Sequence, residues 1–279
     1  MRTLRGGKAV VTGGGVGIGR AIAMELARQG CAVWVADRDA DAAADVVSEL
    51  KANGAQARQT VCDLTDPAAL DELTAQITTD WPDVNLLINN AGLTYYGPTH
   101  EMSDAQWQSV LDLNLHAPIR LIHRLLPHLR QREAAHVVNV CSMYGLVSYR
   151  KQAAYQTTKF GMVGLTLSLR YEYAGTGLGF SAVCPGYVRD THFFDAVLTP
   201  PDRRAKTPPR ALTCTPEAVA RATVRAIRRD RGVVVLTPLA RWQWAMTRWF
   251  PRGFDALQRW GYGRKARGKR RETRDAPGR

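Results

Sequence analysis

The chain has 279 residues, 45% of them hydrophobic and 23% charged, which is typical of a globular protein and excludes a disordered chain. This length fits one α/β domain with a full core and a ligand cleft. The net charge of +13 belongs to the C-terminal part, because residues 1–200 contain 17 Lys and Arg against 19 Asp and Glu, whereas residues 201–279 contain 21 against 6.

Short apolar segments alternate with helical patterns along most of the chain. Strands are predicted at Lys8–Thr12, Ala32–Ala36, Ala57–Cys62, Asn85–Asn89, His136–Cys141, Gly179–Cys184 and Gly232–Leu236. Helices are predicted at Gly19–Gln29, at Ala40–Ala52, after the cap Asp66-Pro67, at Ser103–Pro127 with a kink at Pro118, and at Ala154–Gly175. This alternation predicts an α/β protein with a single Rossmann-type, doubly wound parallel sheet of about seven strands and helices on both faces.

Residues 241–279 differ in character, and we assign them to a basic, Trp-rich extension that follows a domain of residues 1–240. Trp242, Ala245, Met246 and Trp249 recur with helical spacing, and the extension contains 12 Lys and Arg against 3 Asp and Glu. Residues 261–279 are predicted to be disordered. Two interpretations stay open: packing on the body or a partner subunit, or contact with an anionic membrane surface. Nucleic-acid binding is disfavoured, because no recognition motif accompanies the charge.

Export, membrane-span and metal-site signals are missing from the sequence. The N-terminal residues contain no apolar signal region, and no run of about 18 apolar residues occurs. The five cysteines include no Cys-x2-Cys pair, and no histidine lies near them at metal-ligand spacing, so no metal site is expected. Their odd number and apolar neighbours favour reduced thiols in the cytoplasm.

A glycine-rich turn joins the first predicted strand to the first helix: Thr12-Gly13-Gly14-Gly15-Val16-Gly17-Ile18-Gly19. Glycines allow the backbone to approach a pyrophosphate, and the helix N-terminus supplies amide donors and a positive dipole. The sequence therefore predicts a nucleotide site, with Gly13, Gly17, Ile18 and Gly19 in contact with the cofactor.

Asp37 follows the second predicted strand, about 20 residues after the glycines. A carboxylate there accepts hydrogen bonds from the ribose hydroxyls and repels a 2′-phosphate, which favours NAD. Arg38 is the opposing signal, because a guanidinium could bind that phosphate. NAD is the predicted cofactor, with NADP as the alternative.

Tyr155 and Lys159 lie four residues apart and therefore on one face of a helix. A nearby ammonium favours the phenolate, so we expect it to lower the pKa of the tyrosine from about 10 towards neutrality. Such a tyrosine can give or take a proton at pH 7.

These motifs occur in the order found in the short-chain dehydrogenase/reductase family, which the chain resembles from about Gly6 to Val188. The motifs that carry the resemblance are the glycine loop, Asn89-Asn90-Ala91-Gly92, Ser142, Tyr155 with Lys159, and Pro185-Gly186-Tyr187-Val188. The match covers about two-thirds of the chain.

The resemblance implies a role for each matching residue. Tyr155 would be the general acid/base, Lys159 would contact the nicotinamide ribose and lower the tyrosine pKa, and Ser142 would hydrogen-bond the substrate oxygen. Asn114 would hold a water molecule in a proton relay. Further cofactor contacts are expected at Asp63, Leu64, Asn90, Gly92, Pro185, Gly186, Val188 and Thr191.

The chain departs from the family pattern after Pro185-Gly186. The threonine expected three or four residues later is represented by Thr191, five after Gly186. Residues 187–212 are expected to form a substrate lid. Among the six histidines, His192 is the one singled out as a candidate functional residue, because it lies in this lid. Aromatic and apolar residues there and on neighbouring loops indicate a lipophilic substrate: Tyr95, Tyr96, Met143, Tyr144, Phe193, Phe194, Val197 and Leu198.

The sequence thus predicts an NAD-dependent enzyme that interconverts a secondary alcohol and a ketone, or an alcohol and an aldehyde, by hydride transfer. The alternative is a catalytically silent, nucleotide-binding scaffold that docks through its basic tail. By resemblance we expect a homodimer or homotetramer formed through the helix that carries Tyr155. We expect a cytoplasmic protein, with membrane association left open.

Overall fold

The computed structural model describes residues 3–191, 198 and 208–260, with the backbone alone described for Ala211. It divides into two compact units, Met1–Thr237 and Pro238–Arg279, and each unit is considered by itself. We keep the division at residue 240 as a proposal. The predicted disorder of residues 261–279 concerns a segment outside the described residues.

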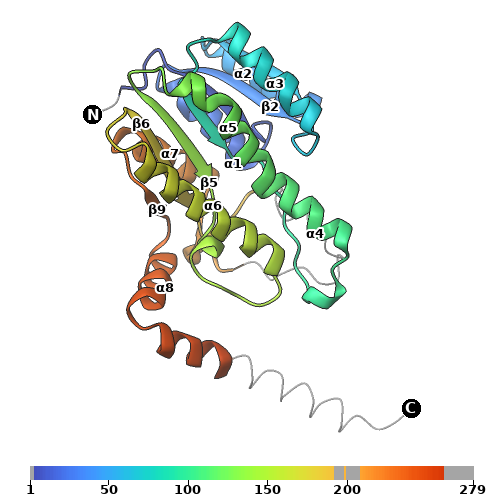
Figure 1. Cartoon of the computed structure of the whole chain (residues 1–279), viewed down its shortest axis with the longest axis vertical. Helices are drawn as coiled ribbons and strands as arrows, with labels where there is room; N and C mark the ends of the chain where they lie inside the picture. Colours follow the sequence, from blue (N-terminus) through green and yellow to red (C-terminus); the bar gives the residue numbers. More distant parts are fainter. Residues whose placement is uncertain (1–2, 192–197, 199–207, 261–279) are drawn as a thin grey trace. The chain divides into compact units, whose positions relative to one another are not determined.

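A parallel sheet of seven strands forms the centre of the first unit, in the order β3-β2-β1-β4-β5-β6-β9 (Figure 1). The strands are β1 Lys8–Thr12, β2 Ala32–Asp37, β3 Ala57–Val61, β4 Leu86–Asn89, β5 Ala135–Val140, β6 Leu178–Cys184 and β9 Val233–Val235. A separate two-stranded sheet pairs β7 Tyr187–Val188 with β8 Thr213–Cys214. The predicted doubly wound α/β fold is confirmed.

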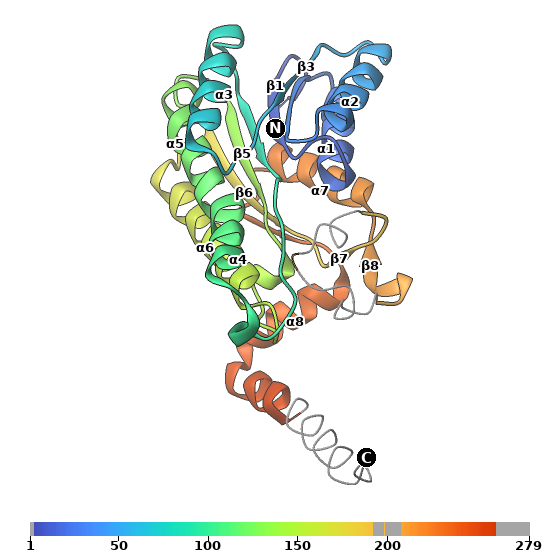
Figure 2. The same cartoon turned by 90° about the vertical axis from the view of Figure 1, so that its right-hand side faces the viewer.

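Helices cover both faces of the large sheet (Figure 2). One face carries α1 Gly17–Arg28, α2 Ala40–Ala52 and α7 Pro216–Arg228, and the other carries α3 Pro67–Asp80, α5 Ala117–Leu129 and α6 Ala153–Glu172. Every residue of β4, β5 and β6 is buried, as expected for central strands covered on both sides.

Local sequence signals explain several of the helix ends. The Asp66 side chain accepts a hydrogen bond from the Ala68 amide, and Pro67 occupies the first position of α3. Gly30, which follows α1, has a φ of +85°, a conformation that glycine adopts without strain.

The prediction of one helix over Ser103–Pro127 is wrong in one respect, because the structure has three helical segments there. α4 spans Asp104–Leu111, a π-helical segment covers Asp112–His116, and α5 begins at Ala117. The expected kink at Pro118 is replaced by this π-helical segment, and Pro118 lies in the first turn of α5, where its missing N–H is tolerated.

The strand order reverses at β1, which pairs with β2 on one side and β4 on the other. In open parallel sheets, ligands bind beyond the carboxyl ends of the strands at such a switch point. The glycine loop follows β1, Asp37 ends β2, and Asn90 follows β4. The fold therefore gathers the predicted cofactor residues at one edge of the sheet.

The described part of the second unit is helical. α8 spans Pro238–Trp249, and residues 251–260 form a second helix. The Phe250 amide donates to the Met246 carbonyl and the Phe254 amide to the Phe250 carbonyl, both at 2.9 Å, so the hydrogen bonding continues between the two. Among the described residues, no helix is both long and apolar enough to span a bilayer.

Candidate active site

The glycine loop is packed so closely that side chains would not fit in it. A Cβ atom on Gly19 would lie 1.9 Å from the Gly13 carbonyl oxygen, and one on Gly13 would lie 2.9 Å from the Ala91 Cα. Gly13 and Gly17 also have positive φ values of 60° and 54°. Packing within the protein and backbone conformation therefore both require glycine at these positions.

The N-terminus of α1 is suited to bind an anion. Val16 precedes the helix and provides no side-chain cap, and no acidic residue lies in the first turn. The first backbone amides of a helix have no partner within it, and they bind phosphate groups in many nucleotide sites. The observed loop and helix fit the pyrophosphate of a dinucleotide.

Asn90 and Thr12 hold the loop in place. The Asn90 Nδ2 donates to the carbonyl oxygens of Thr12 and Gly13 at 3.0 and 2.9 Å. The Thr12 hydroxyl oxygen accepts the amides of Asn90 and Ala91 at 3.0 and 3.2 Å. Asn90 was predicted here, whereas Thr12 was missed, although its place at the end of the first strand was a usable signal.

Asp37 lies against the glycine loop. One carboxylate oxygen accepts the Gly15 amide at 2.8 Å, and the other accepts the Asp39 amide at 3.2 Å. The carboxylate thus stands at the end of β2, next to the phosphate loop, where a ribose would lie.

Asp63 and Leu64 follow β3, beside this region. The Thr65 amide and hydroxyl hold the pKa of Asp63 below its usual value, and the positive charge of Arg38 lowers it further. Arg38 is therefore close enough to Asp63 for their charges to interact, and the Leu64 side chain is buried.

Tyr155 and Lys159 lie on α6, and Ser142 follows β5; all three are buried. The Lys159 Nζ donates to the Val140 carbonyl oxygen at 3.0 Å and lies 5.6 Å from the centre of the Tyr155 ring. The Ser142 side chain hydrogen-bonds to the phenol. The structure therefore brings together the hydroxyl, phenol and ammonium groups that the sequence singled out.

The predicted lowering of the Tyr155 pKa is wrong for this structure. Burial raises the pKa of the phenol well above its usual value, because a phenolate would lose its hydration, and the hydrogen bond from Ser142 opposes this only in part. Burial also lowers the pKa of Lys159. The sequence showed the spacing of the two groups, but it could not show how completely they are desolvated.

Asn114 lies in the π-helical segment, with its side chain fully used. Its Oδ1 accepts the Leu93 amide at 2.8 Å, while its Nδ2 donates to the Leu93 carbonyl at 2.8 Å and to the Thr158 hydroxyl at 3.2 Å. A Cβ atom on Gly92 would lie 3.1 Å from the Asn114 Oδ1 and 3.7 Å from the Lys159 Nζ. Asn114, Gly92 and Lys159 are therefore neighbours.

The segment after β6 closes the site on another side. The Met143 amide donates to the Pro185 carbonyl at 2.8 Å, which links this segment to the loop after Ser142. Thr191 lies 3.6 Å from the position of a Cβ atom on Gly17, so it reaches the glycine loop. Most of the predicted lid, including His192, Phe193, Phe194 and Val197, lies outside the described residues.

One aromatic ring, that of Tyr144, lies beside the phenol among the described residues. The ring centres of Tyr144 and Tyr155 lie 6.3 Å apart at 89°, and those of Tyr144 and Tyr149 lie 5.2 Å apart. Tyr95, on the loop after β4, is buried. The aromatic residues expected on neighbouring loops thus include at least one, Tyr144, beside the predicted acid/base.

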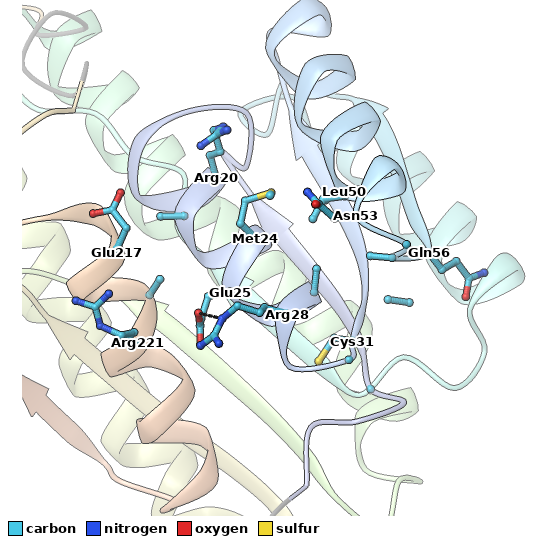
Figure 3. A pocket seen from close by; sticks show the side chains of 18 of the residues that line it. Arg20, Met24, Glu25, Arg28, Cys31, Leu50, Asn53, Gln56, Glu217 and Arg221 are labelled. Atoms are coloured by element: carbon cyan, nitrogen blue, oxygen red, sulfur yellow. Dashed lines mark hydrogen bonds and ion pairs between the residues drawn. The ribbon is translucent and has the colours of Figure 1, made fainter.

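A groove of about 870 Å³ lies along the outer side of α1 and is lined at one point by Gly17 of the glycine loop (Figure 3). Its labelled walls include Arg20, Met24 and Glu25 from α1 with Glu217 and Arg221 from α7. None of the predicted catalytic residues lines it. We therefore locate the chemistry at Tyr155 rather than in this groove.

Comparison with known proteins agrees with this arrangement. Residues 7–200 match the family described as short chain dehydrogenase. The chain is 31% identical over 266 residues to a ketoacyl reductase, HetN, from Nostoc sp., covering 93% of this chain and 91% of that protein.

Two solved structures of similar proteins contain a dinucleotide. A short-chain dehydrogenase/reductase from Burkholderia phymatum in complex with NAD is 29% identical, with a TM-score of 0.80 over 89% of this chain and 95% of that one. A metagenomic short-chain oxidoreductase in complex with NADP is 28% identical, with a TM-score of 0.69 over 85% and 98%. The chain therefore belongs to the short-chain dehydrogenase/reductase family of oxidoreductases, which bind NAD or NADP on a Rossmann fold.

Proposed function

We propose that this protein interconverts a ketone and a secondary alcohol, or an aldehyde and an alcohol, with Tyr155 as the general acid/base. The proposal rests on one observation: the side chains of Ser142, Tyr155 and Lys159 are buried close together at the carboxyl edge of the sheet, the edge that also carries the glycine loop. A silent scaffold would have no need to bury these three polar groups together, because burying polar groups costs free energy.

Residues of both halves of the sheet would hold the cofactor. Gly13, Gly17 and the first amides of α1 would hold the pyrophosphate, and Asp37 would bind the adenine ribose. We propose that Ile18, Gly19, Arg38, Asp63, Leu64, Asn90, Gly92, Lys159, Pro185, Gly186, Val188 and Thr191 complete the site. When bound, the nicotinamide ring supplies or accepts the hydride.

The protein's own residues manage the proton and the oxygen charge. During ketone reduction, negative charge grows on the substrate oxygen, and Ser142 donates a hydrogen bond to it while Tyr155 gives up its proton. The raised pKa of Tyr155 keeps the phenol protonated at neutral pH, ready to donate. The Lys159 ammonium, held by the Val140 carbonyl, stabilises the phenolate that remains.

The backbone carbonyl of Asn114 would contribute to this proton path by binding a water molecule. Its side chain is occupied by Leu93 and Thr158, which leaves the carbonyl as the group that can bind water. Pro118, four residues later, has no N–H and cannot give this carbonyl its α-helical hydrogen bond. We propose that a water molecule bound there replaces the proton that Tyr155 gives up.

We propose NAD as the preferred cofactor, with NADP as the alternative. The Asp37 carboxylate beside the loop would repel a 2′-phosphate, and Val16 brings no positive charge to the loop. We further propose a lipophilic carbonyl substrate, supported by Tyr144 beside Tyr155 and by the reaction named for the Nostoc relative. A homo-oligomer remains our expectation from the resemblance, and a cytoplasmic location remains our expectation from the cysteine pattern.

Substitution of Tyr155 tests the proposed function. Tyr155→Phe removes the proton donor but keeps the ring, so turnover of a panel of ketones should fall by about 10²–10⁴-fold. NADH binding, followed by fluorescence and thermal shift, should stay close to that of the unaltered protein.

The same measurements distinguish the alternative function. If the unaltered protein binds NADH or NADPH but turns over no alcohol or ketone, the result supports the alternative function, a catalytically silent nucleotide-binding scaffold. If Tyr155→Phe keeps full turnover, Tyr155 is not the acid/base and our assignment of the site is wrong.

A further inference from the structure

Large apolar side chains are exposed together in the second unit. Trp242 is 53% exposed, Trp249 78%, Phe250 63% and Leu257 56%. Single exposed apolar residues are normal on protein surfaces, but several within a short helical stretch mark an interaction surface.

Apolar side chains, including Trp242 and Trp249, form a stripe on α8. Residues three and four apart on a helix share a face, and the apolar residues recur at that spacing: Leu239, Trp242, Met246 and Trp249. Arg241 and Arg248 lie on the opposite face by the same geometry. α8 is therefore amphipathic, with Trp242 and Trp249 on one side and the arginines on the other, where Arg248 lies over the ring of Trp244 at 5.4 Å.

The helix of residues 251–260 repeats the pattern. Phe254, Leu257 and Trp260 are spaced by three residues and share a face, on which Leu257 and Trp260 are exposed and Phe254 is buried, whereas Arg252 and Arg259 lie on the other side. Each of the two helices therefore places aromatic and aliphatic groups on the side opposite its exposed arginines.

The charge of the second unit indicates its partner. Residues 238–279 contain 12 Lys and Arg against 3 Asp and Glu, and residues 1–237 contain 26 against 22. Both parts are therefore net positive, so neither the first unit nor a second copy of the chain offers the opposite net charge. The net charges therefore favour a different, anionic surface as the partner.

We infer that α8 and residues 251–260 form a membrane-docking surface, which lies in the interface of a bilayer rich in anionic lipid. Tryptophan, phenylalanine and leucine would enter the boundary between headgroups and acyl chains, and arginines would contact lipid phosphates. Among the described residues, no helix is long and apolar enough to cross the hydrocarbon core. A nucleic acid would satisfy the charge but offers no apolar phase for the leucines.

Vesicle sedimentation with the full-length protein tests this surface. The protein should bind vesicles of equal parts phosphatidylcholine and phosphatidylglycerol, bind vesicles of phosphatidylcholine alone far more weakly, and dissociate as salt is raised. Arg252→Gln with Arg259→Gln should weaken binding by about fivefold for each charge removed. The matched control, Arg252→Lys with Arg259→Lys, should bind as the unaltered protein does.

Three further variants separate the apolar contribution to vesicle binding from the catalytic activity. Trp242→Ala with Trp249→Ala should lose at least about tenfold in vesicle affinity, whereas Trp242→Phe with Trp249→Phe should lose much less. Both pairs should keep turnover of a water-soluble substrate. Tyr155→Phe should bind vesicles normally, so a failure of the proposed reaction would not look like a failure of docking.

Three outcomes would overturn the inference. They are equal binding to neutral and anionic vesicles, unchanged binding after the tryptophan substitutions, and binding to a DNA duplex with no binding to vesicles. The last result would assign the basic extension to nucleic acid.

Discussion

At the scale of single residues, burial decides the chemistry of this site. Tyr155 is buried, and the pKa of its phenol rises because a phenolate there would lose its hydration. Lys159 is also buried, and its ammonium is held by a backbone carbonyl. The pair is therefore set to donate a proton at neutral pH, and removing that proton requires a more alkaline solution.

The pH dependence of the two directions should differ accordingly. Because the Tyr155 pKa lies above its usual value, the phenol stays protonated between pH 6 and about pH 9, so kcat/KM for ketone reduction should stay nearly level there. Alcohol oxidation needs the phenolate, and its kcat/KM should rise by about tenfold per pH unit over the alkaline part of this range. A fall in oxidation with rising pH would contradict the assigned role.

Asp37 should decide the choice of cofactor. Asp37→Ala removes the charged acceptor for the ribose, so NAD affinity should fall by about 1.5–3 kcal/mol, and the preference against NADP should relax. Asp39→Ala is the matched control, because Asp39 caps α2 through the Ala42 amide without contacting the loop. Titration calorimetry with both cofactors checks this, and an unchanged preference would place the ribose away from Asp37.

At the scale of elements, two irregular segments shape the site. The glycine loop between β1 and α1 would bring backbone amides to the cofactor in the proposed site, and the π-helical segment between α4 and α5 positions Asn114 against Leu93 and Thr158. Segments of π-helix inside α-helices are often found at functional sites. Both segments depend on contacts with residues from other strands and helices.

A methyl group in the glycine loop should damage both binding and stability. In Gly19→Ala the new Cβ atom would overlap the Gly13 carbonyl and lie 2.6 Å from the Asn90 Nδ2, so we expect a loss of at least about 1–3 kcal/mol in stability. Cofactor binding should fall below detection. Gly253→Ala, where nothing lies within 4 Å, is the control and should leave both unchanged or slightly improved.

Thermal unfolding and NADH titration measure these effects. A Gly19→Ala protein that binds NADH with nearly normal affinity would show that the loop does not hold the cofactor as proposed.

At the scale of the whole molecule, α6 presents one face to the sheet and another outward. Tyr155 and Lys159 are buried on the inner side, whereas Thr157, Phe160, Gly161 and Gly164 are exposed on the other. An aromatic residue beside two glycines makes a flat surface that a second subunit could cover. This surface agrees with the expectation of an oligomer formed through the helix that carries Tyr155.

Placing a charge on this face should break the assembly. The unaltered protein should have the mass of a dimer or tetramer by light scattering, and Phe160→Glu should reduce it to a single chain, because an unpaired charge buried in an interface costs several kcal/mol. Phe160→Leu should keep the assembly. If the unaltered protein already has the mass of one chain, the expectation is wrong.

The sequence by itself determined the features that depend on local spacing. The alternation of strands and helices, the glycine loop at the first turn, and the Tyr155–Lys159 pair are read from neighbours within a few residues, since helix and strand periods are fixed by backbone geometry. These features were sufficient to predict the fold and to place the candidate chemistry.

Only the tertiary structure decided the features that depend on distant contacts. Thr12 braces Asn90 across 78 residues, and the Val140 carbonyl binds Lys159 from another element. The sequence also missed the π-helical segment and the direction of the Tyr155 pKa. Both follow from packing and desolvation, which depend on the atoms that surround a residue in the folded chain rather than on its neighbours in sequence.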